Sequence, residues 1–235
     1  MMKKSNLLNP FSIKLLACLF MVIDHIAMIF LPPAHALYVP LRIIGRISAP
    51  IFFYTLAEGL KKTSNRRLYL YRLLVAATIM MAGNALIALL GASSLENPPT
   101  VLQPNIFIHM FLIALGIDKL ETVMFTNPFR TIRSVAISAA AFIAVILLPG
   151  YRWLAISSVL TFYIIEKQWL RDIVYIFLSL LICILTQQYI QTFMVLSILF
   201  ITNCSREKPK RSWKWFFYVF YPLHLWLLYG ISIII

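Results

Sequence analysis

The sequence contains little charge, and acidic residues are the scarcer charged type. Charged residues make up 12% of the 235 residues, and only eight of them are Asp or Glu, whereas a typical soluble domain is about 25% charged. Cysteine is also rare: the chain has only Cys18, Cys183 and Cys204. Their number is odd and their spacing does not match a metal site. The composition therefore argues against a soluble domain, and we predict neither a disulfide framework nor a metal site.

Long apolar blocks take the place of the missing charge. Hydrophobic residues make up 61% of the chain and the mean hydropathy is +0.86, with apolar runs long enough to cross a bilayer. We predict an all-α polytopic membrane protein in which residues 1–235 form one domain of about nine transmembrane helices. The predicted spans are Ile13–Phe30, Leu41–Leu60, Leu68–Leu90, Asn105–Ile117, Ile132–Leu148, Trp153–Ile165, Ile173–Thr186, Ile190–Thr202 and Trp215–Ile235.

The net charge of +13 comes from Lys and Arg in short clusters between the apolar runs. The sequence has no long basic tail and no basic helix face, which argues against binding of nucleic acid. Short cytoplasmic loops of membrane proteins collect positive charge. With nine spans and a cytoplasmic N-terminus, only Arg42, Arg46 and Arg152 fall on the outer half. We therefore predict that the C-terminus lies outside and that lipids surround the chain.

Polar side chains inside the predicted spans are the main candidates for function. Asp24 and His25 lie in the middle of the first span, where an ionised Asp costs about 2.5–3.5 kcal/mol on insertion scales. His109 and His224 lie at a similar predicted depth. Arg46 is about one and a half helical turns below the outer end of its span. We expect these side chains to converge on one polar cavity.

Each of these residues also has a simpler explanation. Asp24 and Arg46 could form only a structural ion pair between the first two helices, and a single intramembrane His is often a packed, hydrogen-bonded residue. Adjacent helical residues point about 100° apart, so we expect Asp24 to contact Arg46 rather than His25. The same residue types are typical of a proton-coupled transporter, although we find no internal repeat. A non-catalytic assembly factor, in which the charges pair helices, is a third possibility.

A cluster of cations follows the second predicted span. These residues could bind the phosphates of a cytoplasmic cofactor, although positive-inside bias explains most of the cluster without a ligand. The candidate cofactor-binding residues are Lys61, Lys62, Arg66, Arg67 and Arg72. Glu58 precedes Lys61 and Lys62 by three and four positions, a spacing that favours an ordinary ion pair at the end of a helix.

Three separated motifs carry a resemblance to a known family. They are MVIDHI at residues 21–26, GRISAPIFF at residues 45–53 and FYVFYPLHL at residues 217–225. Together with AEGL at residues 57–60 and NRR at residues 65–67, they resemble the TraX family of F-pilin acetylases. The same elements are distantly similar to membrane acyltransferases of the acyltransferase-3 type, which modify surface glycans.

The resemblance implies transfer of an acetyl group from acetyl-CoA to the N-terminal amine of an exported pilin subunit, in the inner membrane of a bacterium. The acceptor stays open, because Tyr221-Pro222 before His224 looks more like the glycan-modifying relatives. An O-acyltransferase that acts on a surface glycan or lipid-linked sugar is therefore the alternative.

Acyl transfer from a thioester needs a base for the attacking group and a donor for the oxyanion that develops. We predict His25 as the general base and His224 as the second candidate, because His is the best-matched base near neutral pH. Arg46 or Asn105 would position substrate or stabilise charge, and Asp24 would hold the polar cluster together. The candidate substrate-positioning residues are Asn105, His109 and Glu58. Direct transfer is preferred, and an acetyl-His intermediate stays open.

Overall fold

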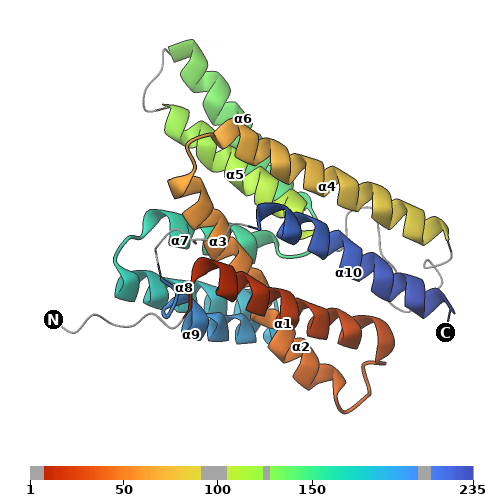
Figure 1. Cartoon of the computed structure of the whole chain (residues 1–235). Helices are drawn as coiled ribbons and strands as arrows, with labels where there is room; N and C mark the ends of the chain where they lie inside the picture. The colour runs from red at the N-terminus through yellow and green to blue at the C-terminus, as the bar shows by residue number, and fades with distance from the viewer. Residues whose placement is uncertain (1–7, 91–104, 124–127, 206–212, 235) are drawn as a thin grey trace.

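The computed structural model describes residues 8–90, 105–123, 128–205 and 213–234, and its regular structure there is helical apart from one isolated bridge between Leu8 and Cys204 (Figure 1). The elements are α1 (Pro10–Phe30), α2 (Tyr38–Arg46), α3 (Ser48–Lys62), α4 (Arg66–Leu89), α5 (Ile106–Val123), α6 (Pro128–Leu147), α7 (Arg152–Ile164), α8 (Gln168–Leu185), the 3-10 helix η2 (Tyr189–Ser197), α9 (Ile198–Ile201) and α10 (Lys214–Ile234). This confirms the predicted all-α class.

Local sequence signals set the ends of the first helices. Asn9 caps α1, because its Oδ1 accepts hydrogen bonds from the backbone N–H groups of Phe11 at 2.9 Å and Ser12 at 2.8 Å. Pro10 is the first residue of α1, where a missing N–H costs nothing. Asn65 caps α4 in the same way through the N–H of Leu68 at 2.9 Å.

Within the described residues, five helical segments are long and apolar enough to cross a membrane. They are Pro10–Phe30, Tyr38–Lys62, Arg66–Leu89, Gln168–Leu185 and Trp215–Ile234. Their outward faces carry large apolar side chains, such as Leu19, Leu86 and Phe177, which are more than half exposed. Such faces are stable against lipid and unfavourable in water. The chain is therefore a multi-pass membrane protein.

Within the described residues, each of the nine predicted spans lies mainly on helical backbone, and two of them are interrupted. The second is divided at Ile47 into α2 and α3. The eighth is a 3-10 helix followed by the single turn α9. The segments Thr131–Leu147, Arg152–Ile164 and Tyr189–Ile201 are apolar but short. Periodicity and hydropathy thus located the helices, but they could not reveal these breaks, which lie next to buried polar groups.

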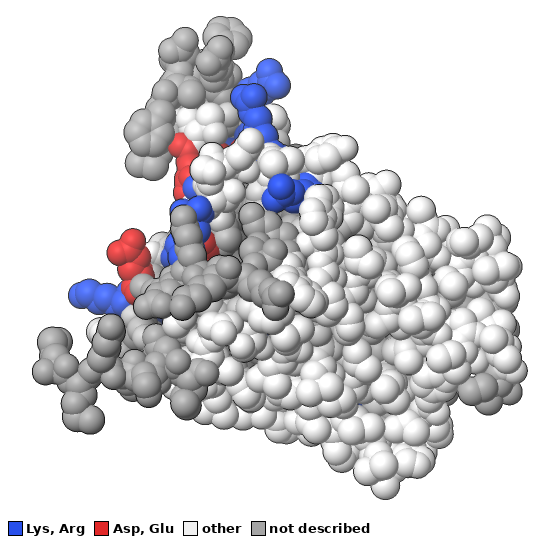
Figure 2. All heavy atoms as spheres, viewed as in Figure 1, with Lys and Arg blue, Asp and Glu red and all other residues white. Residues whose placement is uncertain are grey.

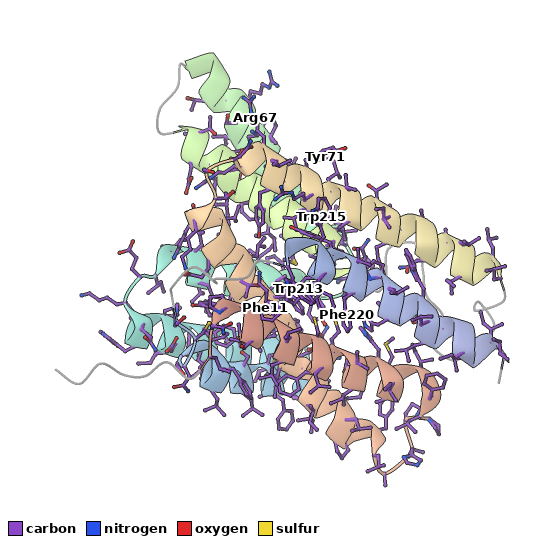
Figure 3. The ribbon with its side chains drawn as sticks, viewed as in Figure 1. Phe11, Arg67, Tyr71, Trp213, Trp215 and Phe220 are labelled. Atoms are coloured by element: carbon purple, nitrogen blue, oxygen red, sulfur yellow. The ribbon has the colours of Figure 1, made fainter. Side chains whose placement is uncertain are left out.

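Charged side chains gather at one end of the molecule in the face shown in Figure 2, where the ends of α3, α5 and α7 and the beginning of α4 lie. In Figure 1, α4 and α10 pack side by side and run away from this end, while α1 packs on α2, α3 and α10. Phe11 at the beginning of α1 contacts Trp213 just before α10, with ring centroids 6.0 Å apart (Figure 3). This aromatic contact joins the two helices that carry the candidate histidines.

Candidate functional site

Two neighbouring cavities lie among the helices. The histidine cavity, of about 670 Å³, is lined by Asp24, His25, Arg46, Asn105, His109 and Tyr151 among others. The basic cavity, of about 330 Å³, is lined by Lys14, Glu58, Lys62 and Arg72 and by several aromatic rings. Ile106 and Tyr221 line both cavities and therefore belong to the wall between them.

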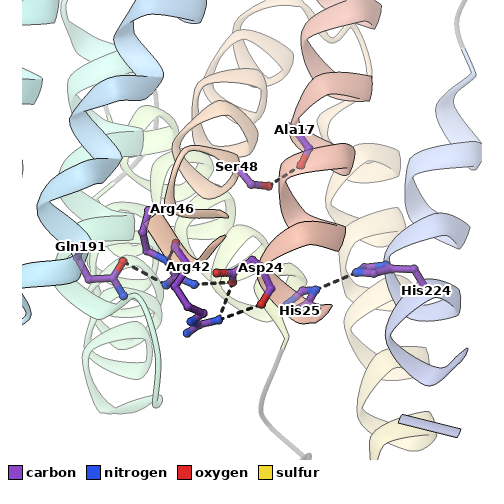
Figure 4. Close-up of polar contacts among 8 residues, drawn as sticks. All are labelled: Ala17, Asp24, His25, Arg42, Arg46, Ser48, Gln191 and His224. Carbon is purple, nitrogen blue, oxygen red and sulfur yellow. Dashed lines mark hydrogen bonds and ion pairs between the residues drawn. The ribbon is translucent and has the colours of Figure 1, made fainter. Parts of the chain in front are cut away.

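Asp24 and His25 point to different helices, as expected for neighbours on a helix (Figure 4). The Asp24 carboxylate forms an ion pair with Arg46 and a second one with Arg42, whose Nη1 lies 2.9 Å from Oδ2. The predicted contact between Asp24 and Arg46 is therefore present. Gly45 allows it, because a Cβ at this position would lie 2.2 Å from the Cβ of Asp24. Any larger residue would push α2 away from α1.

Arg46 is held from three sides. Besides Asp24, its Nε donates to the carbonyl oxygen of Arg42 at 3.3 Å and its Nη1 donates to Gln191 Oε1 at 3.3 Å. The guanidinium thus joins α1, α2 and η2 in the buried interior, where such a charge needs this compensation. Two guanidinium groups face one carboxylate, so this cluster carries one net positive charge.

His25 faces His224 on α10, and their rings share a hydrogen bond of 2.9 Å between Nδ1 of His25 and Nε2 of His224 (Figure 4). Nδ1 of His224 lies 2.8 Å from the carbonyl oxygen of Phe220. A carbonyl only accepts, so this Nδ1 carries the proton and Nε2 of His224 is the acceptor. Nδ1 of His25 must then be the donor, which leaves the lone pair on its Nε2. In this tautomer, Nε2 of His25 can accept a proton.

Two buried acceptor atoms of the histidine cavity lack a hydrogen-bond partner among the described residues. They are Oδ1 of Asp24 and Nε2 of His109. Nδ1 of His109 lies 3.2 Å from the carbonyl oxygen of Asn105, and the backbone of Pro149 also faces the ring. With the proton on Nδ1, the lone pair is on Nε2. Buried polar atoms are nearly always paired, so water or a bound molecule in the cavity would donate to these two atoms.

Asn105 lines the histidine cavity, and its side chain holds the backbone around it. Its Nδ2 donates to the carbonyl oxygen of Ala77 at 3.0 Å, and its Oδ1 accepts from the N–H of Ile108 at 3.3 Å. It therefore fixes the beginning of α5 against α4. A direct role toward a substrate stays a prediction.

The predicted phosphate-binding cations separate into two groups. Lys62 and Arg72 line the basic cavity. Lys61 instead donates to the carbonyl oxygen of Phe162 at 2.9 Å, and Arg66 pairs with Glu121. Arg67 is exposed on the outward face of α4 (Figure 3).

Glu58 also lies in the basic cavity and forms the predicted ion pair at the end of α3, with Lys62 Nζ 2.5 Å from its Oε2. It is therefore separated by the shared wall from Asn105 and His109, the other two predicted positioning residues. Glu58 therefore lines the cavity that carries Lys14, Lys62 and Arg72.

Several lining residues were not singled out from the sequence. Lys14 faces the basic cavity, whereas Arg42, Tyr151 and Gln191 face the histidine cavity. Gln191 could have been noticed as an uncharged polar residue inside a short apolar segment. Tyr151 follows Pro149-Gly150, a turn in which Gly150 has φ 110°, and nothing in that local pattern indicates a position in the lining of a cavity.

The described lining of the histidine cavity contains one carboxylate, that of Asp24, and two histidines, His25 and His109. No group of three or more His, Cys, Asp or Glu side chains that could hold a metal ion occurs within the described ranges. The carboxylate of Asp24 forms ion pairs with Arg42 and Arg46. The chemistry that this geometry supports is proton transfer at His25 beside a buried charge cluster.

Comparison with known proteins gives the chain a family. It is 24% identical over 233 residues to a probable fimbrial assembly protein FimC, serogroup H1, of Dichelobacter nodosus, with 94% of each chain covered. No solved structure matches. The family model described as TraX protein matches residues 11–232, which include His25, His224 and all lining residues of the two cavities except Pro10. The chain therefore belongs to the TraX family.

Proposed function

We propose that the protein is an inner-membrane acetyltransferase that moves an acetyl group from cytoplasmic acetyl-CoA to the terminal amine of an exported, pilin-like peptide. The observation that carries this proposal is the pair of cavities on two sides of one wall, with the unprotonated nitrogen of an oriented His25 on one side. Membership of the TraX family and the similarity to a fimbrial assembly protein support the pilin-like acceptor.

The orientation in the membrane follows from the charges. The basic cavity takes its cations from Lys14 near the beginning of α1, Lys62 at the end of α3 and Arg72 near the beginning of α4. The end of α3 and the beginning of α4 lie at the charged end of the molecule (Figures 1 and 2), and positive-inside bias assigns such an end to the cytoplasm. Nine crossings with the N-terminus inside and the C-terminus outside then open the basic cavity toward cytoplasmic acetyl-CoA.

The basic cavity suits the donor. Three cations and one carboxylate leave a net positive rim for phosphates, and the aromatic lining provides an apolar path for the rest of the donor. Burial raises the pKa of the nearby Cys204 thiol to about 11, so almost no thiolate exists at neutral pH. Direct transfer is therefore favoured over an acetylated Cys204.

The histidine cavity suits an amine better than a hydroxyl. Oδ1 of Asp24 and Nε2 of His109 both require hydrogen-bond donors. An ammonium group offers three N–H donors, whereas a hydroxyl offers one. A peptide N-terminus could therefore satisfy both acceptors as an ammonium. It releases one proton to solvent to become the neutral amine before it attacks. This favours N-acetylation over the O-acyl transfer to a glycan.

In the proposed reaction, His25 carries one proton from the neutral amine to the CoA thiolate. The amine nitrogen attacks the thioester carbonyl carbon, forming the C–N bond while its proton passes to Nε2 of His25. The resulting imidazolium is stabilised through its Nδ1–H by Nε2 of His224. Collapse of the tetrahedral intermediate breaks the C–S bond, and the proton on His25 leaves with the CoA thiolate as the free thiol.

The test is a transfer assay with the purified protein in lipid nanodiscs. Radiolabelled acetyl-CoA is mixed with short synthetic peptides that copy pilin N-termini, with the same peptides blocked at the N-terminus, or with a sugar acceptor. We expect label only on the free-amine peptides, with an equal release of CoA thiol. Label on the sugar alone would contradict the amine acceptor. If neither label transfer nor thiol release occurred with any acceptor, the acetyltransferase proposal would be wrong.

A further inference from the structure

Tyr221 occupies the wall between the two cavities. It lines both of them and is only 6% exposed. Its ring centroid lies 6.4 Å from that of His25, 5.7 Å from that of His224 and 5.1 Å from that of Phe107. No other tyrosine lines both cavities. Its phenol is therefore next to the candidate base and at the boundary that an acyl group must cross.

The hydroxyl of Tyr221 is oriented by the beginning of α5. The backbone N–H of Ile106, the first residue of that helix, donates to the Tyr221 oxygen at 3.4 Å. This bond uses a lone pair of the oxygen and leaves the phenolic proton available for donation. The N-terminal end of a helix also carries a partial positive charge, which favours negative charge developing nearby.

An oxyanion must develop during the proposed transfer, because attack on the thioester pushes the carbonyl electrons onto oxygen. Arg46 was the candidate for stabilising this charge. Three of its five N–H groups donate to Asp24, Arg42 and Gln191, so its guanidinium is held by α1, α2 and η2. Asn105 has its amide bound to backbone groups. The hydroxyl of Tyr221 is a donor on a ring that lies against His25 and lines both cavities.

We propose that Tyr221 is a catalytic residue whose hydroxyl donates a hydrogen bond to the thioester oxyanion at the wall between the two cavities. This inference rests on the acetyltransferase function proposed above. In the tetrahedral intermediate, the oxygen that received the carbonyl electrons accepts the Tyr221 hydrogen bond. When the C–S bond breaks, the carbonyl re-forms and the hydroxyl keeps its proton throughout. The net change is acetyl transfer from sulfur to nitrogen and one proton carried by His25 to the thiolate.

The test is Tyr221→Phe, which keeps the ring and the wall and removes only the hydroxyl. Loss of one oxyanion donor costs about 10²–10³-fold in kcat in other enzymes, so we expect a loss of about 10²-fold here. The KM for acetyl-CoA and the thermal midpoint should stay close to those of the wild type. The matched control is Tyr175→Phe, which removes a buried hydroxyl that donates to the Met194 carbonyl and lines neither cavity. Its kcat should be unchanged.

A second variant covers the case in which the phenylalanine protein does not fold. A fluorinated tyrosine incorporated at position 221 keeps the hydroxyl and should retain transfer. A kcat of Tyr221→Phe within threefold of the wild type would overturn the inference, as would loss of transfer in the folded fluorotyrosine protein. If the wild type itself transfers no acetyl group, the proposed function fails, and that result is distinct from either outcome.

Discussion

The two cavities share a wall but hold their charges differently. In the histidine cavity, Asp24 and Arg46 are both buried and each is fixed by named partners. In the basic cavity, Lys14 lies over the Phe217 ring at 5.4 Å and Arg72 over the Trp215 ring at 5.8 Å. Buried, compensated charges have one geometry, whereas long cationic side chains over aromatic rings can adapt.

This difference predicts different kinetic consequences. A rigid polar site is suited to a reaction, because catalytic groups act only when they are oriented before the transition state forms. An adaptable basic rim is suited to a flexible anionic molecule, for which electrostatic attraction matters more than fixed geometry. Substitutions in the histidine cavity should therefore change kcat or folding. Substitutions in the basic cavity should change KM.

The largest effect is expected at His25. The variant His25→Asn keeps a side-chain N–H that can replace Nδ1 as the donor to His224, and it removes the basic Nε2. We expect kcat to fall by about 10³-fold, within the range typical of a lost general base, while the KM for acetyl-CoA stays nearly constant. The measurement is steady-state release of CoA thiol in nanodiscs.

The matched control for His25 is His35→Asn, which changes an exposed histidine in the loop between α1 and α2. Its kcat should equal that of the wild type. Transfer by His25→Asn at more than a third of the wild-type rate would show that His25 is not the base. The TraX assignment would be unaffected.

The second effect is on folding. Asp24→Asn leaves Arg42 and Arg46 without the carboxylate that neutralises them, and an uncompensated buried charge costs about 3–5 kcal/mol. We expect a large drop in thermal midpoint in detergent. Asp118→Asn is the control, because the pair with its neighbour Lys119 is partly exposed and such pairs contribute about 0–1 kcal/mol. Equal midpoints for the two variants would contradict the structural role of the Asp24 cluster.

The helical segments and one ion pair of the site could be predicted from the sequence. Apolar runs locate helices because lipid permits no unpaired backbone, and Asp24 needs a partner because a buried charge is costly. Arg46 was the nearest cation at a compatible depth. The meeting of His25 with His224 was expected from depth alone, although the two residues are 199 positions apart.

The remaining features depend on packing that no local pattern encodes. Arg42 and Arg46 lie one helical turn apart, on the same face of α2. Both contact Asp24 only because α2 packs closely on α1, which the sequence could not show. The position of Tyr221 in the wall depends on how α10 packs against α5. The sequence also could not separate Lys62, which lines the basic cavity, from its neighbour Lys61, which binds a backbone carbonyl of α7.

The smallest effect is expected at the cations of the basic cavity. It tests whether substitutions there change KM and not kcat. In Lys62→Met/Arg72→Met, the rim loses two cations, and we expect the KM for acetyl-CoA to rise by about tenfold, roughly 1.4 kcal/mol, with kcat unchanged. Added salt should reduce the difference in KM between the double variant and the wild type, because salt screens the attraction between exposed charges and the phosphates. Arg67→Met removes an exposed cation of the same helix that does not line the cavity, so its KM should stay within twofold. A fall in kcat without a change in KM for the double variant would mean that the basic cavity is not the donor site.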